Sequence, residues 1–319
     1  MKGSRWQPVI TAVVVTAAFL PPYLVPQQAR PANLSAAKTE QQFAPPVVAE
    51  TKAGCRAIKD IVYAPDRGLA GDLYVPNVDD GGLHPAVIVI HGGAWTKGQR
   101  NSIDQIDIAH RLTEHGYAAF LIDYRLIQDG GLYPSPIKDV NDAFGYLVTN
   151  AAKWGVDPNR IGMFGGSVGG TMALLSAYAP HTGPFAPSTY KDVTQKVRAV
   201  VANSPLTDIR DIELTWVIKW MNDTPWHTPK IYADASPVTY VTSAVPTLLI
   251  HGTADSTVDF NQSVTLAKAL RANGVTAELV QLPGANHHPL YNDLVADRER
   301  AFARMFQFLD KNLKGDSAP

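Results

Sequence analysis

The chain of 319 residues can bury a sizeable core, because 45% of its residues are hydrophobic and only 18% are charged, proportions that exclude a disordered chain. Its net charge of −1 argues against a basic surface for nucleic acid or acidic lipid. A single cysteine, Cys55, excludes an intramolecular disulfide framework and zinc-finger spacing. We therefore expect a folded globular protein without a nucleic-acid partner.

The first segment of the chain has the pattern of a targeting sequence. Lys2 and Arg5 precede an apolar run over 9–20, which two prolines end. A charged start followed by a short apolar run is typical of a secretory signal peptide, and the run is shorter than the roughly 20 residues that a bilayer requires. We predict a signal peptide over 1–29 and an exported protein, periplasmic or secreted, with an uncleaved N-terminal membrane anchor as the alternative. The Ala-, Pro- and Gln-rich segment 30–56 is predicted to be a linker.

Downstream of the linker, strand-like and helix-like patterns alternate. Apolar runs typical of strands and apolar stripes at helical spacing follow each other along the chain, with no internal repeat. The expected strands are 58–63, 69–75, 86–90, 117–122, 161–164, 197–202, 247–250 and 277–282. The expected helices are 103–112, 135–148, 169–177 and 302–313. Strands separated by helices indicate an α/β fold with a mostly parallel sheet.

A glycine-rich turn between a strand and a helix carries the strongest chemical signal. The sequence GGSVG at 165–169 places Ser167 between the strand that ends at Phe164 and the next helix. In this context a G-x-S-x-G turn projects the serine hydroxyl from the edge of the sheet, where it can act as a nucleophile. The turn matches neither the dinucleotide fingerprint nor a phosphate-binding loop with its lysine. We predict that Ser167 is a catalytic nucleophile.

A second glycine motif, HGGAW at 91–95, follows a buried strand directly. Acyl transfer needs hydrogen-bond donors aimed at a developing oxyanion. We expect the backbone amides of Gly92, Gly93 and Val168 to supply them. The His91 ring is expected to shape the loop, and no cluster of residues has the spacing of a metal site.

The general base must be one of nine histidines, oriented by an acid at a strand end. Asp255 follows a buried strand in the sequence LLIHGTAD, and Asp259 is the alternative, which we expect to cap the next helix instead. The loop LPGANHH after the following strand supplies His287, with His288 as the alternative. The resulting chain order is Ser167, Asp255, His287, as expected for an α/β-hydrolase.

These motifs together resemble a known family. HGGAW, the strand end DYRL at 123–126, GGSVGG and HGTAD occur in this order within 57–315. The chain resembles the α/β-hydrolases, and within them the small bacterial carboxylesterases near the hormone-sensitive-lipase group, in the branch with an HGGxW loop. The resemblance implies one catalytic domain over 57–315, with a central sheet flanked by helices. It also implies hydrolysis of small carboxylic esters with short acyl groups through an acyl-enzyme on Ser167, without metal or organic cofactor.

The segment 206–244 is expected to form a small cap. Trp216 and Trp220 lie one helical turn apart and share a face. With Trp95, they are predicted to line a substrate pocket, or alternatively to pack a surface helix onto the core. There are two alternative hypotheses for the function. One is an exported serine peptidase of the same fold, and the other is an acetyl or feruloyl esterase acting on polysaccharides. The peptidase is disfavoured because the chain lacks room for a large gating domain.

Overall fold

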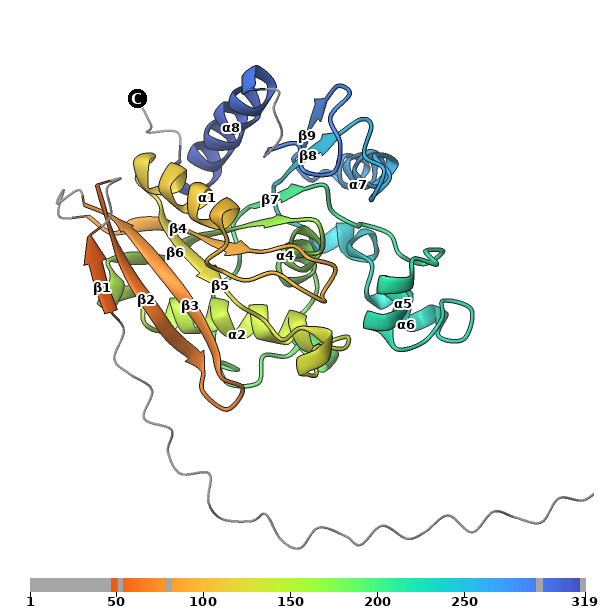
Figure 1. Cartoon of the computed structure of the whole chain (residues 1–319), viewed down its shortest axis with the longest axis horizontal. Coiled ribbons are helices and arrows are strands. Elements are labelled where there is room, and N and C mark those ends of the chain that lie inside the picture. Colours follow the sequence, from red (N-terminus) through yellow and green to blue (C-terminus); the bar gives the residue numbers. More distant parts are fainter. Residues whose placement is uncertain (1–46, 51–53, 78–81, 291–294, 316–319) are drawn as a thin grey trace, which may run out of the picture. The chain divides into compact units, whose positions relative to one another are not determined.

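The computed structural model describes residues 47–50, 54–77, 82–290 and 295–315 (Figure 1). They belong to one unit, which runs from Phe43 to Pro319. The predicted signal peptide and residues 30–46 of the predicted linker lie outside the described residues. None of the helices in the described ranges is long and apolar enough to cross a membrane.

Nine strands in the described part of the chain form one sheet, in the order β1-β2-β3-β5-β4-β6-β7-β8-β9. At one edge, β1, β2, β3 and β5 pair antiparallel in this order. From β5 onward the sheet is parallel, through β4, β6, β7, β8 and β9. The expectation of a mostly parallel sheet is therefore confirmed. The strands are β1 (Val47–Glu50), β2 (Cys55–Ala64), β3 (Leu69–Pro76), β4 (His84–Ile90), β5 (Ala118–Ile122), β6 (Val156–Gly166), β7 (Val200–Asn203), β8 (Thr247–Gly252) and β9 (Ala277–Leu282).

The carboxyl end of the predicted linker is corrected by the structure. Residues Val47–Glu50 form β1, which pairs antiparallel with β2 so that Val48 lies opposite Ile58. Four residues are too few to show a strand period in the sequence, and pairing with the edge of β2 supplies the hydrogen bonds that make them a strand. The sheet therefore begins inside the segment that composition predicted to be a linker.

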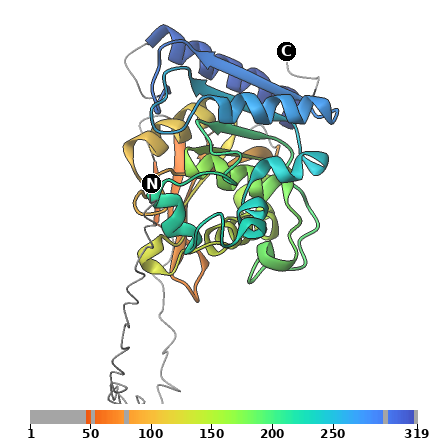
Figure 2. The same cartoon turned by 90° about the vertical axis from the view of Figure 1, so that its right-hand side faces the viewer.

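Helices cover both faces of the sheet. The side chains of α1 and α8 share one buried cluster, and an ion pair at 3.1 Å joins Arg111 of α1 to Glu299 of α8. The side chains of α2, α4 and α7 belong to the second cluster, on the other face, and Figures 1 and 2 show the two layers. The helices are α1 (Ile103–Glu114), α2 (Ser135–Thr149), α3 (Ala151–Trp154), α4 (Val168–Tyr178), α5 (Thr215–Met221), α6 (Pro229–Asp234), α7 (Asn261–Ala272) and α8 (Val295–Leu309).

The loops that carry the motifs gather at one edge of the sheet. The carboxyl ends of parallel strands point the same way, so the segments that follow β4, β6, β8 and β9 meet there. The predicted cap segment 206–244 contains α5, α6 and the 3₁₀ segment Pro237–Ser243, between β7 and β8. Val217, Trp220 and Tyr232 of this segment are buried in the larger cluster.

Candidate active site

Ser167 occupies a strained turn between β6 and α4. Its φ of 54° and ψ of −126° lie in a region that non-glycine residues seldom adopt. The backbone amide of Ser167 donates a 2.7 Å hydrogen bond to the carbonyl oxygen of Asn203 at the end of β7. This bond from the neighbouring strand stabilises the strained backbone and holds the serine at the edge of the sheet.

Three of the residues singled out in the sequence meet at this turn. Nε2 of His287 lies 3.0 Å from the Ser167 hydroxyl oxygen. Nδ1 of His287 lies 2.8 Å from Oδ2 of Asp255. Because the carboxylate only accepts hydrogen bonds, Nδ1 donates, which leaves the Nε2 of a neutral ring free to accept the serine proton. The Asp255 side chain is completely buried and that of His287 is 9% exposed.

Asp255 is held as a carboxylate by several donors. Burial acts to raise its pKa, but hydrogen bonds from His251, His287 and the amides of Val258 and Thr257 outweigh it, so the pKa of Asp255 lies well below its usual range. Oδ1 accepts the two amides, at 2.9 and 2.8 Å. The acid is therefore ionised and fixed in orientation before any proton moves.

The loops of Asp255 and His287 are joined by contacts that the sequence did not reveal. A Cβ atom on Gly252 would lie 2.3 Å from the carbonyl oxygen of Ala285, so only glycine permits this approach. The side-chain oxygen of Asn286 accepts hydrogen bonds from the amides of Ser256 (3.1 Å) and His287 (2.7 Å). The asparagine that precedes the two histidines in this loop was the sequence feature from which the second contact could have been predicted.

The two alternatives for base and acid lie elsewhere. His288 is exposed, and its ring centroid is 4.8 Å from that of His287. Partial burial of the ring, followed by the neighbouring His287, lowers the pKa of His288. The carboxylate of Asp259 accepts a 2.8 Å hydrogen bond from the amide of Asn261, as expected of a residue that caps α7. Neither side chain has a hydrogen bond to Ser167.

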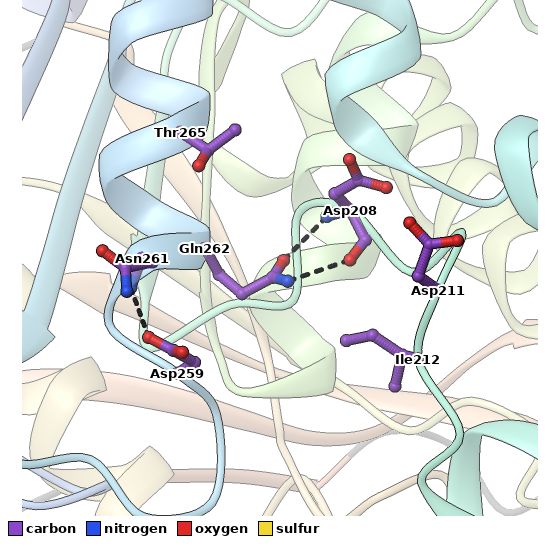
Figure 3. A pocket seen from close by; sticks show the side chains of 7 residues that line it. All are labelled: Asp208, Asp211, Ile212, Asp259, Asn261, Gln262 and Thr265. Carbon is purple, nitrogen blue, oxygen red and sulfur yellow. Dashed lines mark hydrogen bonds between the residues drawn. The ribbon is translucent and has the colours of Figure 1, made fainter.

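Asp259 instead lines a separate pocket of about 220 Å³ beside the first turn of α7 (Figure 3). Gln262 reaches across it, where its side-chain oxygen accepts from the amide of Asp208 at 2.8 Å and its side-chain nitrogen donates to the carbonyl of Asp208 at 2.9 Å. These bonds tie the start of the cap segment to α7. Three carboxylates line the pocket, yet no group of three or more His, Cys, Asp or Glu side chains in the described residues could hold a metal ion.

The loop after β4 places Gly92 beside the serine. A Cβ atom on Gly92 would lie 3.3 Å from that of Ser167. The His91 ring is buried, stacks on Tyr124 with centroids 4.3 Å apart, and its Nδ1 donates to the carbonyl of Gly92 at 2.7 Å. Burial lowers the pKa of His91, against the opposing effect of that hydrogen bond. The ring therefore shapes the loop, as expected from the sequence.

The predicted pocket-lining role of two tryptophans is corrected by the structure. Trp95 and Trp220 are completely buried and stack with ring centroids 3.7 Å apart and planes inclined by 9°. Trp216 is partly exposed, and its ring centroid lies 5.8 Å from that of Trp95. Trp95 and Trp220 pack the cap segment onto the core, the alternative weighed from the sequence, because their buried stack joins the loop after β4 to α5. Trp216 is the member of this group that keeps an accessible surface.

Comparison with protein-family models places the chain in a known family. The BD-FAE model matches residues 71–270, more than half of the chain. The chain belongs to the BD-FAE family. Ser167, Asp255 and the HGGAW loop fall inside the matched range, and the fold is that of the α/β-hydrolases.

Several proteins similar to this chain are named as esterases or ester hydrolases. A probable carboxylic ester hydrolase of Mycobacterium tuberculosis, LipM, is 30% identical over 66% of this chain and 51% of its own length. The solved structure of a truncated carbohydrate esterase from gut microbiota has a TM-score of 0.73 and 22% identity, over 83% of this chain and 99% of that one. A butyrate-bound thermophilic esterase of the planctomycete Thermogutta terrifontis has a TM-score of 0.66 and 22% identity, over 81% and 94%.

The curated relatives are longer than the matched region. The chain spans about half the length of the curated relatives it matches, from 51% to 57% for the first six. The likeness to these relatives therefore covers the hydrolase fold and leaves their remaining segments outside the comparison.

Proposed function

We propose that the chain is a serine esterase that hydrolyses small carboxylic esters through an acyl-enzyme on Ser167. The observation that carries this proposal is the continuous hydrogen-bonded path from the Ser167 hydroxyl to His287 (3.0 Å) and from His287 to the buried carboxylate of Asp255 (2.8 Å). Hydrogen-bond reach between nucleophile and base, with the base oriented by a third group, is the geometric mark of covalent catalysis.

In the proposed reaction, the Ser167 oxygen attacks the ester carbonyl while Nε2 of His287 takes the hydroxyl proton. His287 then gives this proton to the leaving alcohol as the C–O bond breaks, and the acyl group remains on Ser167. Water next attacks the acyl-enzyme, with His287 again as the base, and releases the acid. Asp255 stays ionised throughout and stabilises the imidazolium that forms twice in the cycle.

The proposed oxyanion hole consists of the backbone amides of Gly92, Gly93 and Val168. Val168 is the first residue of α4, so its amide has no acceptor within the helix and points out of the helix N-terminus. Gly92 lies close to Ser167, since a Cβ atom built on it would be 3.3 Å from that of the serine. The first loop is therefore near the ester carbonyl that Ser167 would attack. Removing one such donor typically slows turnover about 10²–10³-fold.

Short acyl groups are the substrates we propose first, with Trp216 at the rim of the acyl site. The T. terrifontis esterase, which shares the fold, carries butyrate in its solved structure. We also propose that the protein is exported, because Lys2, Arg5 and the apolar run 9–20 have the pattern of a signal peptide. Amino-terminal sequencing of the protein recovered from outside the cytoplasm tests export, and an intact Met1 there would favour an anchor.

The esterase proposal is tested by hydrolysis of p-nitrophenyl acetate, butyrate, octanoate and palmitate. Each ester is assayed with the purified chain and with its Ser167→Ala variant. We expect turnover of the short esters, with at least about a 10³-fold loss in the variant, because the nucleophile is removed. Circular dichroism of both proteins controls for folding. Most of the activity surviving in a folded Ser167→Ala variant would falsify the mechanism.

A polysaccharide esterase is the second candidate, because the gut-microbiota structure of the same fold is a carbohydrate esterase by its name. Acetylated and feruloylated oligosaccharides in the same assay separate the two. A kcat/KM for a sugar ester at least tenfold above that for p-nitrophenyl acetate would favour the polysaccharide substrate.

A further inference from the structure

A second histidine contacts the carboxylate of Asp255. Nε2 of His251 lies 3.0 Å from Oδ2, the same oxygen that Nδ1 of His287 contacts at 2.8 Å. His251 lies near the end of β8, and its side chain and that of Asp255 are both completely buried. One carboxylate oxygen is thus shared by two imidazoles, and only His287 is hydrogen-bonded to Ser167.

The partners of His251 determine where its proton lies. Nε2 is also 3.1 Å from the carbonyl oxygen of Val258, and because carbonyl and carboxylate oxygens only accept here, Nε2 carries the hydrogen. Nδ1 lies 2.7 Å from the hydroxyl oxygen of Ser263 on α7, which is also completely buried. With the hydrogen on Nε2, Nδ1 of the uncharged tautomer accepts and the Ser263 hydroxyl donates. Both ring nitrogens therefore have a hydrogen-bond partner in the core.

We propose that His251, held by Ser263, is a positioning residue that sets the basicity of His287 through the shared Oδ2 of Asp255. A hydrogen bond from a second donor withdraws negative charge from the oxygen that faces His287. The carboxylate consequently stabilises the His287 imidazolium less than it would alone. This inference rests on the proposed roles of Ser167, His287 and Asp255.

The alternative is that His251 only fills the core beside Phe260, whose ring meets it edge-on with centroids 5.6 Å apart. Such a filler would change stability when replaced, and it would leave the titration of His287 unchanged. Other groups around the pair stay in place in every variant below. They are the amides of Thr257 and Val258 on Oδ1 of Asp255, the ring of His288 beside His287, and Lys97 and Asp104, which act on His288.

The test is the titration of the His287 ring by NMR in the full chain, which requires no turnover. In His251→Leu, Oδ2 loses one donor, so we expect the pKa of His287 to rise by about one unit, the effect of one hydrogen bond to a charged group. His251→Gln restores a donor at the position of Nε2, and its titration should return towards the wild type. Ser263→Ala removes the bond that orients the ring, and a smaller rise is expected.

The same variants are then assayed on p-nitrophenyl butyrate. We expect the acid limb of kcat/KM to move to higher pH with the His287 titration. On this acid limb, kcat in His251→Leu should fall about tenfold, because a pKa about one unit higher leaves about a tenth as much unprotonated base, and KM should change little, since the substrate site is untouched. Ser176→Ala is the matched control, because Ser176 is a buried serine near the carboxyl end of α4 whose hydroxyl donates to Asn141 at 2.5 Å and not to His251, Asp255 or His287. It should leave both quantities unchanged.

A wild-type His287 titration in folded His251→Leu and Ser263→Ala would overturn the inference. If His251→Leu does not fold, Ser263→Ala decides alone, because it removes a single hydroxyl. Failure of the proposed function has a different signature. It shows as wild-type protein without ester turnover, or as turnover that survives Ser167→Ala, whereas the NMR titration is unaffected by either.

Discussion

Gly169 packs directly against the carbonyl oxygen of Ile90: a Cβ atom built on Gly169 would lie 2.3 Å from that oxygen and 2.6 Å from the carbonyl oxygen of His91. Gly169 is the second residue of α4, and Ile90 is the last residue of β4. This contact therefore sets the separation between the turn of Ser167 and the HGGAW loop. It is a backbone contact, so no side-chain rotation can relieve an added methyl group.

The first prediction follows from this contact. Gly169→Ala should lower the free energy of unfolding by about 3 kcal/mol or more, at the upper end for overpacking, and should reduce ester turnover by separating the two loops. Urea denaturation and p-nitrophenyl butyrate hydrolysis measure the two effects. Gly274→Ala is the control, because a Cβ there meets nothing within 4 Å. Its positive φ should cost only about 1 kcal/mol, with activity unchanged.

The second prediction concerns Asp255 and pH. Its pKa in the folded protein lies below the ordinary value of 3.8, so ionised Asp255 stabilises the fold above that pH, and this contribution is lost as the pH falls. Asp255→Asn removes the contribution. The difference in unfolding free energy between wild type and variant should be constant from about pH 7 to 5 and should shrink below about pH 4.

Urea denaturation across this pH range measures the difference, and a gap that stays constant down to about pH 3 would contradict the assignment. Ester turnover of Asp255→Asn should fall about 10³–10⁴-fold, because an asparagine favours the wrong tautomer of the base. His288→Asn serves as the control for the loop, since His288 is exposed.

The third prediction concerns the cap. Trp220→Ala should cost about 3–5 kcal/mol of unfolding free energy, as for other fully buried tryptophans, because it removes the stack on Trp95. Trp226→Ala is the matched control, since the Trp226 side chain is 59% exposed. This variant should change the unfolding free energy by no more than about 0.5 kcal/mol. Thermal denaturation of both variants checks this pair. Equal destabilisation by the two would show that the stack does not hold the cap.

The fourth prediction concerns the buried ion pair that Arg125, in the strand end DYRL, forms with Asp139. Arg125 binds Asp139 in a bidentate manner, at 2.7 and 2.8 Å, and Arg67 binds the same carboxylate at 2.9 Å. The Asp139 side chain is completely buried. Asp139→Asn should therefore cost about 3 kcal/mol, the lower end for breaking a buried ion pair, because it leaves Arg125 without its carboxylate while Arg67 keeps its ion pair with Asp142 at 2.7 Å.

Arg125→Met should cost less than Asp139→Asn, because Arg67 still neutralises the carboxylate. Urea denaturation of both variants and of the double variant gives the comparison. A larger loss in Arg125→Met than in Asp139→Asn would show that Arg67 contributes little.

Much of the fold could be predicted from local patterns, because the spacing of apolar residues that distinguishes a strand from a helix is visible within a short stretch of sequence. The elements around Ser167 are examples: the run before Phe164 forms β6, and the residues after the turn form α4. Residues Val47–Glu50 could not be predicted in the same way, because that strand exists only through its pairing with β2. The buried stack of Trp95 and Trp220 was missed for a similar reason: its partners are far apart in the chain.

The sequence by itself determined the α/β class, the sharp turn at Ser167 and the small set of candidates for acid and base, because each depends on residue types at short spacing. Only the tertiary structure decided which histidine and which aspartate meet the serine. His287 and His288 are adjacent in the chain, and their separation into a hydrogen-bonded and an exposed ring depends on how the loop after β9 packs against Gly252. His251 is only four residues from Asp255 in the chain, but its ring is oriented by the hydrogen bond to Ser263, and that bond exists only because α7 packs against β8.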